Sequence, residues 1–194
     1  MIKRTDLTRR AALLLPLLLS ACGGEEPLRD TPPLHFDYLT PLRLNVASID
    51  VGEAPPPSPV EAASPAPAGE ALRRMALDRL AAGGSAGHAA FVIDEARVVR
   101  VGSRLEGVLA VHLDVSASGG VRSGFAEARV SQSLTVRGDI RGALYDLTRQ
   151  MMDDMNVEFE FQVRRSLRDW LQETTTAPPP APVQQQDLGA PLAL

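Results

Sequence analysis

The sequence predicts an α+β fold: a four-stranded antiparallel sheet with two helices on one face, in the order β-α-β-β-β-α. All 16 prolines of the 194-residue chain lie at position 67 or before or at position 178 or after, so residues 68–177 can form long, uninterrupted elements. This region contains three consecutive segments of alternating polar and apolar residues, followed by a long amphipathic segment. Antiparallel strands with one polar face need a helix layer on the other face. We therefore predict one domain over residues 41–173.

The first predicted strand covers residues 42–51. Apolar and polar residues alternate over its first half. Ile49 and Val51 continue the apolar set on the opposite parity, which predicts a twist or bulge near Ala47.

A proline-rich segment and a short helix come next. Residues 54–68 hold six prolines together with Ala, Ser and Glu, a composition that predicts a disordered loop. Residues 69–82 have apolar side chains at helical spacing, and Gly83-Gly84 is expected to end this helix.

Three strands are predicted at residues 89–101, 105–115 and 124–137. Gly102-Ser103 and Ser118-Gly119-Gly120 supply the hairpin turns between them. The second strand alternates most clearly, and its predicted inward residues are Leu109, Val111, Leu113 and Val115.

The last predicted element is a helix from Asp139 to about Glu173, because apolar residues recur there at steps of three and four. Residues 157–163 also alternate with period two, which is a strand pattern. We favour a helix because good helix formers surround this stretch and no turn signal interrupts it. In a helix, Val157 and Phe161 point away from the main apolar stripe. They either contact a loop or the proline-rich segment, or form a surface for a partner protein.

The N-terminal residues 1–21 have the pattern of a secretory signal peptide. Four basic residues precede the apolar stretch 11–19, which is too short to span a membrane. The residues that follow, Leu19-Ser20-Ala21-Cys22, resemble the lipobox of bacterial lipoproteins. The alternative is an ordinary leader with an unrelated Cys. Thr8-Arg9-Arg10 partly resembles a twin-arginine signal, so either export route stays open.

The lipobox resemblance implies cleavage before Cys22 and a covalent lipid on its sulfur, which would anchor the chain in the lipid bilayer. Asp at the next position is the usual inner-membrane retention signal, so Gly23 favours the outer membrane of the cell envelope. Residues 22–40 are expected to be the lipidated Cys and a flexible spacer, and residues 174–194 a disordered tail. Extended from Gly23 to Thr40, the spacer would reach about 55–60 Å.

Composition excludes several function classes. The only Lys, Lys3, lies in the leader, so the mature chain has no Schiff-base, P-loop or kinase-type lysine. The single Cys excludes an intramolecular disulfide and a multi-Cys metal site. Without the leader, the chain has 16 Arg and 23 acidic residues. The resulting net charge of −7 argues against a nucleic-acid partner. We expect no cofactor other than the lipid on Cys22, and no metal.

One short motif has a catalytic counterpart. Gly83-Gly84-Ser85-Ala86-Gly87 matches G-x-S-x-G, the nucleophile elbow of α/β-hydrolases. That elbow needs a strand before the Ser and a helix after it, which is the reverse of the predicted order. We therefore interpret the motif as a helix-ending turn, and an esterase with Ser85 as nucleophile as the alternative.

The remaining polar clusters are interpreted as solvated surface. His35 and His88 are isolated, and His112 shares an outward strand face with Asp114 but lacks the further ligands of a metal site. The acidic side chains of the long helix have no aromatic residues around them to stack a sugar, as a glycosidase would need. These acidic residues are Asp146, Asp153, Asp154, Glu158 and Glu160. We interpret Met151, Met152 and Met155 as packing residues rather than a copper site.

The lipobox, the spacer and the β-α-β-β-β-α order together resemble certain envelope lipoproteins over residues 41–173. They are similar to the ABC-type transport auxiliary lipoproteins, to the lipoprotein plug of the lipopolysaccharide-assembly β-barrel, and to uncharacterised lipoproteins of alphaproteobacteria. The resemblance implies a non-catalytic accessory of an envelope lipid or lipopolysaccharide transport or assembly complex. It carries over no binding residue.

The candidate partner surfaces are therefore taken from the sequence pattern: Arg43, Arg97, Arg129 and the Val157/Phe161 spot. Two other function classes remain open. One is an envelope hydrolase, either the Ser85 esterase or a carboxylate enzyme. The other is a structural or peptidoglycan-associated lipoprotein.

Overall fold

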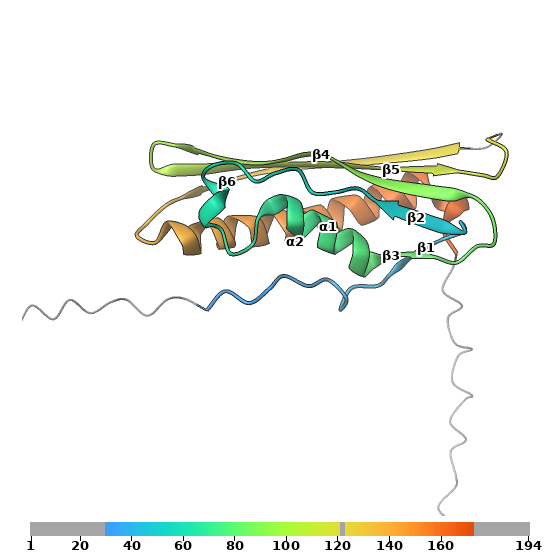
Figure 1. Ribbon diagram of the computed structural model, residues 1–194, viewed down its shortest axis with the longest axis horizontal. Coiled ribbons are helices and arrows are strands. Elements are labelled where there is room, and N and C mark those ends of the chain that lie inside the picture. The colour runs from blue at the N-terminus through green and yellow to red at the C-terminus, as the bar shows by residue number, and fades with distance from the viewer. Residues whose placement is uncertain (1–29, 121–122, 173–194) are drawn as a thin grey trace, which may run out of the picture. The chain divides into compact units, whose positions relative to one another are not determined.

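The computed structural model describes residues 30–120 and 123–172, and the compact unit that carries the fold begins at Thr31. Its two helices, α1 (Ala68–Arg79) and α2 (Ile140–Ser166), lie on one side of a four-stranded sheet (Figure 1). The α+β class with two helices on one sheet face is confirmed. In the described part of the chain, the opposite face of the sheet carries no helix.

The sheet has the strand order β2-β4-β5-β6. Its three long strands are β4 (His88–Val101), β5 (Arg104–Ser116) and β6 (Ser123–Thr135), which pair antiparallel as predicted. Their bounds lie within two residues of the prediction because their alternation is local. The inward residues predicted for β5 are confirmed, since Leu109, Val111, Leu113 and Val115 are all buried.

The sheet is mixed rather than purely antiparallel, which corrects the prediction. The edge strand β2 (Ser48–Val51) pairs parallel with β4, and β1 (Leu42–Leu44) pairs parallel with β3 (Leu80–Ala82) in a second, two-stranded sheet. The single strand predicted over 42–51 is therefore two strands in different sheets. The change of apolar parity near Ala47 marks this break rather than a bulge.

A bulge does occur in β4, where the register with β5 shifts between Ile93 and Glu95. The extra residue switches which parity faces the core. Phe91 is buried before the bulge and Val98 after it, while Val101 is 56% exposed.

Helix α1 ends at Arg79 rather than at Gly83-Gly84. Leu80, its C-cap, is already extended with φ −90° and ψ 130°, and the chain continues directly into β3. The pairing of β3 with β1 uses the three residues that the amphipathic pattern assigned to the helix.

The proline-rich segment 54–68 packs on the domain, so the expectation of a disordered loop is wrong. It contains a short 3-10 helix, η1 (Glu61–Ala63), and the Glu61 side chain is only 2% exposed. Proline fixes φ and has no backbone N–H donor. A proline-rich segment can still pack when a buried acceptor forms hydrogen bonds with the N–H groups of its other residues.

The domain also begins earlier than residue 41. Phe36 is 3% exposed, its N–H donates to Asp78 Oδ2 at 2.9 Å, and the Tyr145 hydroxyl donates to the Pro32 carbonyl at 2.9 Å. Residues 31–40 are therefore part of the packed domain rather than of a flexible spacer.

Helix α2 confirms the helical interpretation of residues 157–163. Asp139 caps its N-terminus by accepting from the N–H groups of Arg141 and Gly142, both at 2.8 Å. The helix ends at Ser166, before the predicted Glu173, because the chain turns through η2 (Arg168–Trp170).

This turn brings the C-terminal end of α2 onto the start of β6. A Cβ on Gly124 would lie 2.5 Å from Leu167 Cδ2 and 2.8 Å from Trp170 Nε1, so only glycine permits the close approach. Beyond the turn, the Gln172 N–H donates to the Arg43 carbonyl at 2.8 Å, which ties the end of the described chain to β1.

Candidate functional site

The exposed apolar spot predicted on the last helix is present. Val157 is 73% exposed and Phe161 54% exposed, one turn apart on α2. The neighbouring residues Met155, Phe159 and Val163 are fully buried, so the two side chains point away from the core. Neither the proline-rich segment nor a described loop buries them.

Strand β6 runs beside α2 and forms an edge of the sheet, because β5 is its only partner among the described strands. An edge strand leaves half of its main-chain N–H and C=O groups without a ladder partner. A groove follows this edge between β6 and α2. The groove residues are Phe125, Ala126, Glu127, Arg129, Glu158, Gln162 and Ser166.

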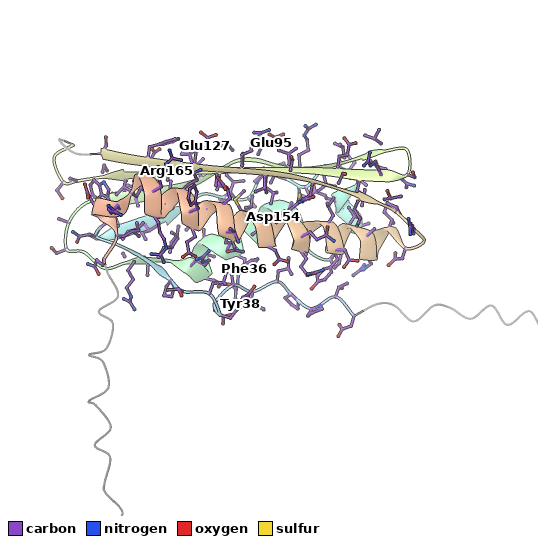
Figure 2. The ribbon with its side chains drawn as sticks, turned by 180° about the vertical axis from the view of Figure 1, so that it is seen from behind. Phe36, Tyr38, Glu95, Glu127, Asp154 and Arg165 are labelled. Atoms are coloured by element: carbon purple, nitrogen blue, oxygen red, sulfur yellow. The ribbon has the colours of Figure 1, made fainter. Side chains whose placement is uncertain are left out.

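Charged side chains surround the apolar spot and the groove. Asp154 and Arg165 lie on α2, and Glu127 lies above them on β6 (Figure 2). Asp154 accepts from Gln132 Nε2 at 2.6 Å. Neither Arg165 nor Glu127 has a hydrogen bond or ion pair with another described residue. We call Val157, Phe161, Asp154, Arg165 and the exposed edge of β6 the β6–α2 surface.

An ion pair with a buried arginine lies on the other side of α2. Arg79, 1% exposed, donates to the backbone carbonyl and the side-chain oxygen of Asn156, both at 3.1 Å, and pairs with Glu160. Burial by itself raises the pKa of Glu160. The hydrogen bonds from Arg164 and Arg79, together with their positive charges, lower it by more, so the pKa of Glu160 lies below its ordinary value. This carboxylate is therefore a structural anion, unlike the raised-pKa acid that a glycosidase needs.

Other acidic residues of α2 also have polar partners. Asp153 pairs with Arg149 at 3.4 Å on the exposed face, and Glu158 accepts from Gln162 at 2.7 Å. Asp146 has a partner as well. Met151, Met152 and Met155 are fully buried, in agreement with their interpretation as packing residues.

Arg97 and Arg129 meet on the uncovered face of the sheet. Both contact the Glu95 carboxylate, Arg97 at 3.4 Å and Arg129 at 2.7 Å. The third predicted arginine, Arg43, lies in the two-stranded sheet. Pairing with Glu95 neutralises part of their charge, so they do not form a strong anion-binding patch.

His112 lies on the same face between two carboxylates. Its Nδ1 is 2.8 Å from Asp94 Oδ2 and its Nε2 is 3.5 Å from Asp114 Oδ2. The bulge in β4 brings Asp94 into this position, which the sequence pattern alone did not indicate. No set of three or more His, Cys, Asp or Glu side chains within residues 30–120 and 123–172 has the arrangement of a metal site.

Ser85 lies exposed in the turn between β3 and β4. The strand–turn–strand context differs from the strand–turn–helix of a nucleophile elbow. The His88 side chain contacts two residues of β2 instead. Its Nδ1 lies 3.2 Å from Ser48 Oγ, and its Nε2 lies 3.5 Å from Asp50 Oδ2. The parallel pairing of β2 and β4 creates this group, so an antiparallel prediction missed it. Asp50 is 80% exposed, and water competes with its contact.

The lipobox residues Leu19, Ser20, Ala21 and Cys22 lie outside the described residues, as does the predicted tail 174–194. None of the helices in the described part of the chain has the length and hydropathy needed to span a bilayer.

No protein-family model matches the chain, and no curated protein is similar to it. Among solved structures, it is similar to the crystal structure of "a putative lipoprotein from Caulobacter crescentus CB15". The two are 16% identical with a TM-score of 0.33, over 60% of this chain and 85% of the other. A similarity at this level carries no information about function.

Proposed function

We propose that this chain is a lipid-anchored lipoprotein of the cell envelope that acts as a non-catalytic accessory of a lipid or lipopolysaccharide transport or assembly complex. The observation that carries the proposal is the lipobox Leu19-Ser20-Ala21-Cys22, placed directly after a basic and apolar leader. The proposed location is the periplasm-facing side of a membrane, with Gly23 favouring the outer membrane.

Because residues 31–40 pack on the domain, the tether between the proposed lipid anchor and the domain is short. Because the domain begins at Thr31, only nine peptide units separate its first residue from Cys22. Such a length reaches about 30 Å at most, roughly half of what a spacer extending to Thr40 would allow. A tether of this length would hold the domain near the membrane, where it could contact machinery of that membrane.

The β6–α2 surface combines apolar side chains with exposed main-chain groups. Exposed apolar side chains beside a free strand edge are typical of protein contacts. The net charge of −7 for the mature chain argues against electrostatic docking on anionic lipid or nucleic acid.

The proposal is tested by isolating the tagged chain from its own membranes in a mild detergent, beside a Cys22→Ser variant. We expect a transporter permease, a solute-binding subunit or an outer-membrane barrel to co-purify with the unaltered chain and to be lost with the variant. Recovery of the chain alone, or of the same proteins with both forms, would contradict the accessory function.

Ser85→Ala distinguishes the hydrolase alternative. We expect this variant to complement a deletion strain as well as the unaltered chain does, because the exposed turn at Ser85 lacks the elbow geometry. A deletion phenotype that Ser85→Ala fails to restore, with normal levels of the variant protein, would favour the esterase.

A further inference from the structure

The β6–α2 surface is complementary to itself, and the first observation is the alignment of its two elements. Asp154 of α2 accepts a hydrogen bond from Gln132 of β6, and Leu167, the C-cap of α2, packs on Gly124 of β6. The strand and the helix therefore run antiparallel. Ala128, midway between the two β6 positions, lies beside the turn of α2 around Glu160.

The second observation is the charge order along β6. Glu127 and Arg129 flank Ala128, and both point to the uncovered face of the sheet. If two copies of β6 pair antiparallel about Ala128, each Glu127 lies opposite the partner subunit's Arg129. The same register places the small residue Ala128 opposite its own copy.

The third observation is that α2 has the same symmetry at the same place. A two-fold axis beside Phe159 and Glu160 sets Asp154 opposite the partner subunit's Arg165, and Val157 opposite the partner subunit's Phe161. The strand and the helix thus require one and the same axis. Each opposite-charge pair and each apolar pair occurs twice, as an isologous interface requires.

Helix α2 packs on β5 as well as on β6, because the Met151 side chain occupies the space beside Gly107. Strands pair about 4.8 Å apart and helices pack about 8–10 Å apart, so the two-fold arrangement requires each α2 to lie about 2 Å further from the axis than its own β6.

We infer that the β6–α2 surface binds a second copy of this chain, forming a two-fold dimer with a continuous eight-stranded sheet. The dimer covers the free edge of β6 and the Val157/Phe161 spot together. It assigns the predicted partner surface to self-association.

The test is a charge exchange on α2, measured by sedimentation equilibrium of the full chain in density-matched detergent. We expect the unaltered chain to be a dimer. Asp154→Arg and Arg165→Asp should each raise the dimer dissociation constant about tenfold or more, because each creates two like-charge contacts. The double variant restores both pairs and should return the constant to within about threefold of the unaltered chain.

Asp153→Arg is the matched control, since Asp153 is exposed on the same helix but lies outside the β6–α2 surface. It should leave the dissociation constant unchanged, whereas Val157→Asp should abolish the dimer. All variants alter exposed side chains, and an unchanged melting curve of the monomer verifies folding. A monomeric unaltered chain, single variants that still dimerise normally, or a double variant without rescue would each overturn the inference.

Discussion

Replacing Arg79 with alanine is expected to lower the free energy of unfolding by about 2–4 kcal/mol, because the buried acceptors that Arg79 serves lose a charged donor together. Arg79 holds together three segments that are distant in sequence. Besides Glu160 and Asn156 on α2, it reaches the Thr40 carbonyl at 3.3 Å. Urea denaturation of the unaltered chain and the variant measures the difference.

Arg74→Ala is the control for this experiment. Arg74 lies on the same helix and pairs with Asp78 at 3.1 Å, but its side chain is 48% exposed. Its removal should cost less than about 1 kcal/mol. Equal losses for the two variants would show that burial of the Arg79 side chain has no special effect.

The pH dependence of the same pair has a definite sign. The folded-state pKa of Glu160 lies below its ordinary value, so the pairing stabilises the fold fully above the ordinary pKa. This contribution is lost as the pH falls through the lowered pKa. The stability difference between the unaltered chain and Glu160→Gln should therefore shrink on acidification, and a constant difference would contradict the assignment.

Replacing Glu61 with alanine should lower the free energy of unfolding by about 2–4 kcal/mol, since several buried donors lose a charged acceptor together. The carboxylate accepts from the N–H groups of Ser58 at 3.1 Å, Ala68 at 3.2 Å and Val98 at 3.3 Å. Ala68 opens α1, whose N-cap Pro67 offers no side-chain acceptor. Glu61 thus caps α1 from seven residues upstream and fixes the proline-rich segment to β4.

Hydrogen exchange locates this effect as well as measuring it. In Glu61→Ala, the backbone amides of residues 58–68 and of the first turn of α1 should exchange faster. The exchange rates of the β5 amides should change only as far as global stability changes. Glu70→Ala, in the same helical turn but exposed, should cost less than about 1 kcal/mol. Unchanged exchange in the proline-rich segment would show that other contacts hold it in place.

The parts of the fold that depend on local pattern could be predicted from the sequence. β5 and β6 alternate with period two over thirteen residues, β4 changes parity at its bulge, and α2 has apolar residues along one stripe. The exposure of Val157 and Phe161 also follows from helical spacing alone. These signals are properties of consecutive residues and do not depend on distant contacts.

The features that the sequence did not predict depend on contacts between distant residues. The parallel pairings of β1 with β3 and of β2 with β4 join segments about 40 residues apart, and short strands carry too little alternation to indicate a partner. Glu61 gives no local sign that it will be buried. The complementarity of the β6–α2 surface became visible only when Gln132 and Asp154 fixed the alignment of strand and helix.

The most direct test of the central claim is the intact mass of the chain purified from membranes. Lipid anchoring at Cys22 predicts a mature chain that begins at Cys22 and carries the added mass of a diacylglyceryl group, with or without an N-acyl chain. The Cys22→Ser variant should lack this mass and leave the membrane fraction. An unmodified chain, or one whose first residue is not Cys22, would contradict the proposed lipoprotein.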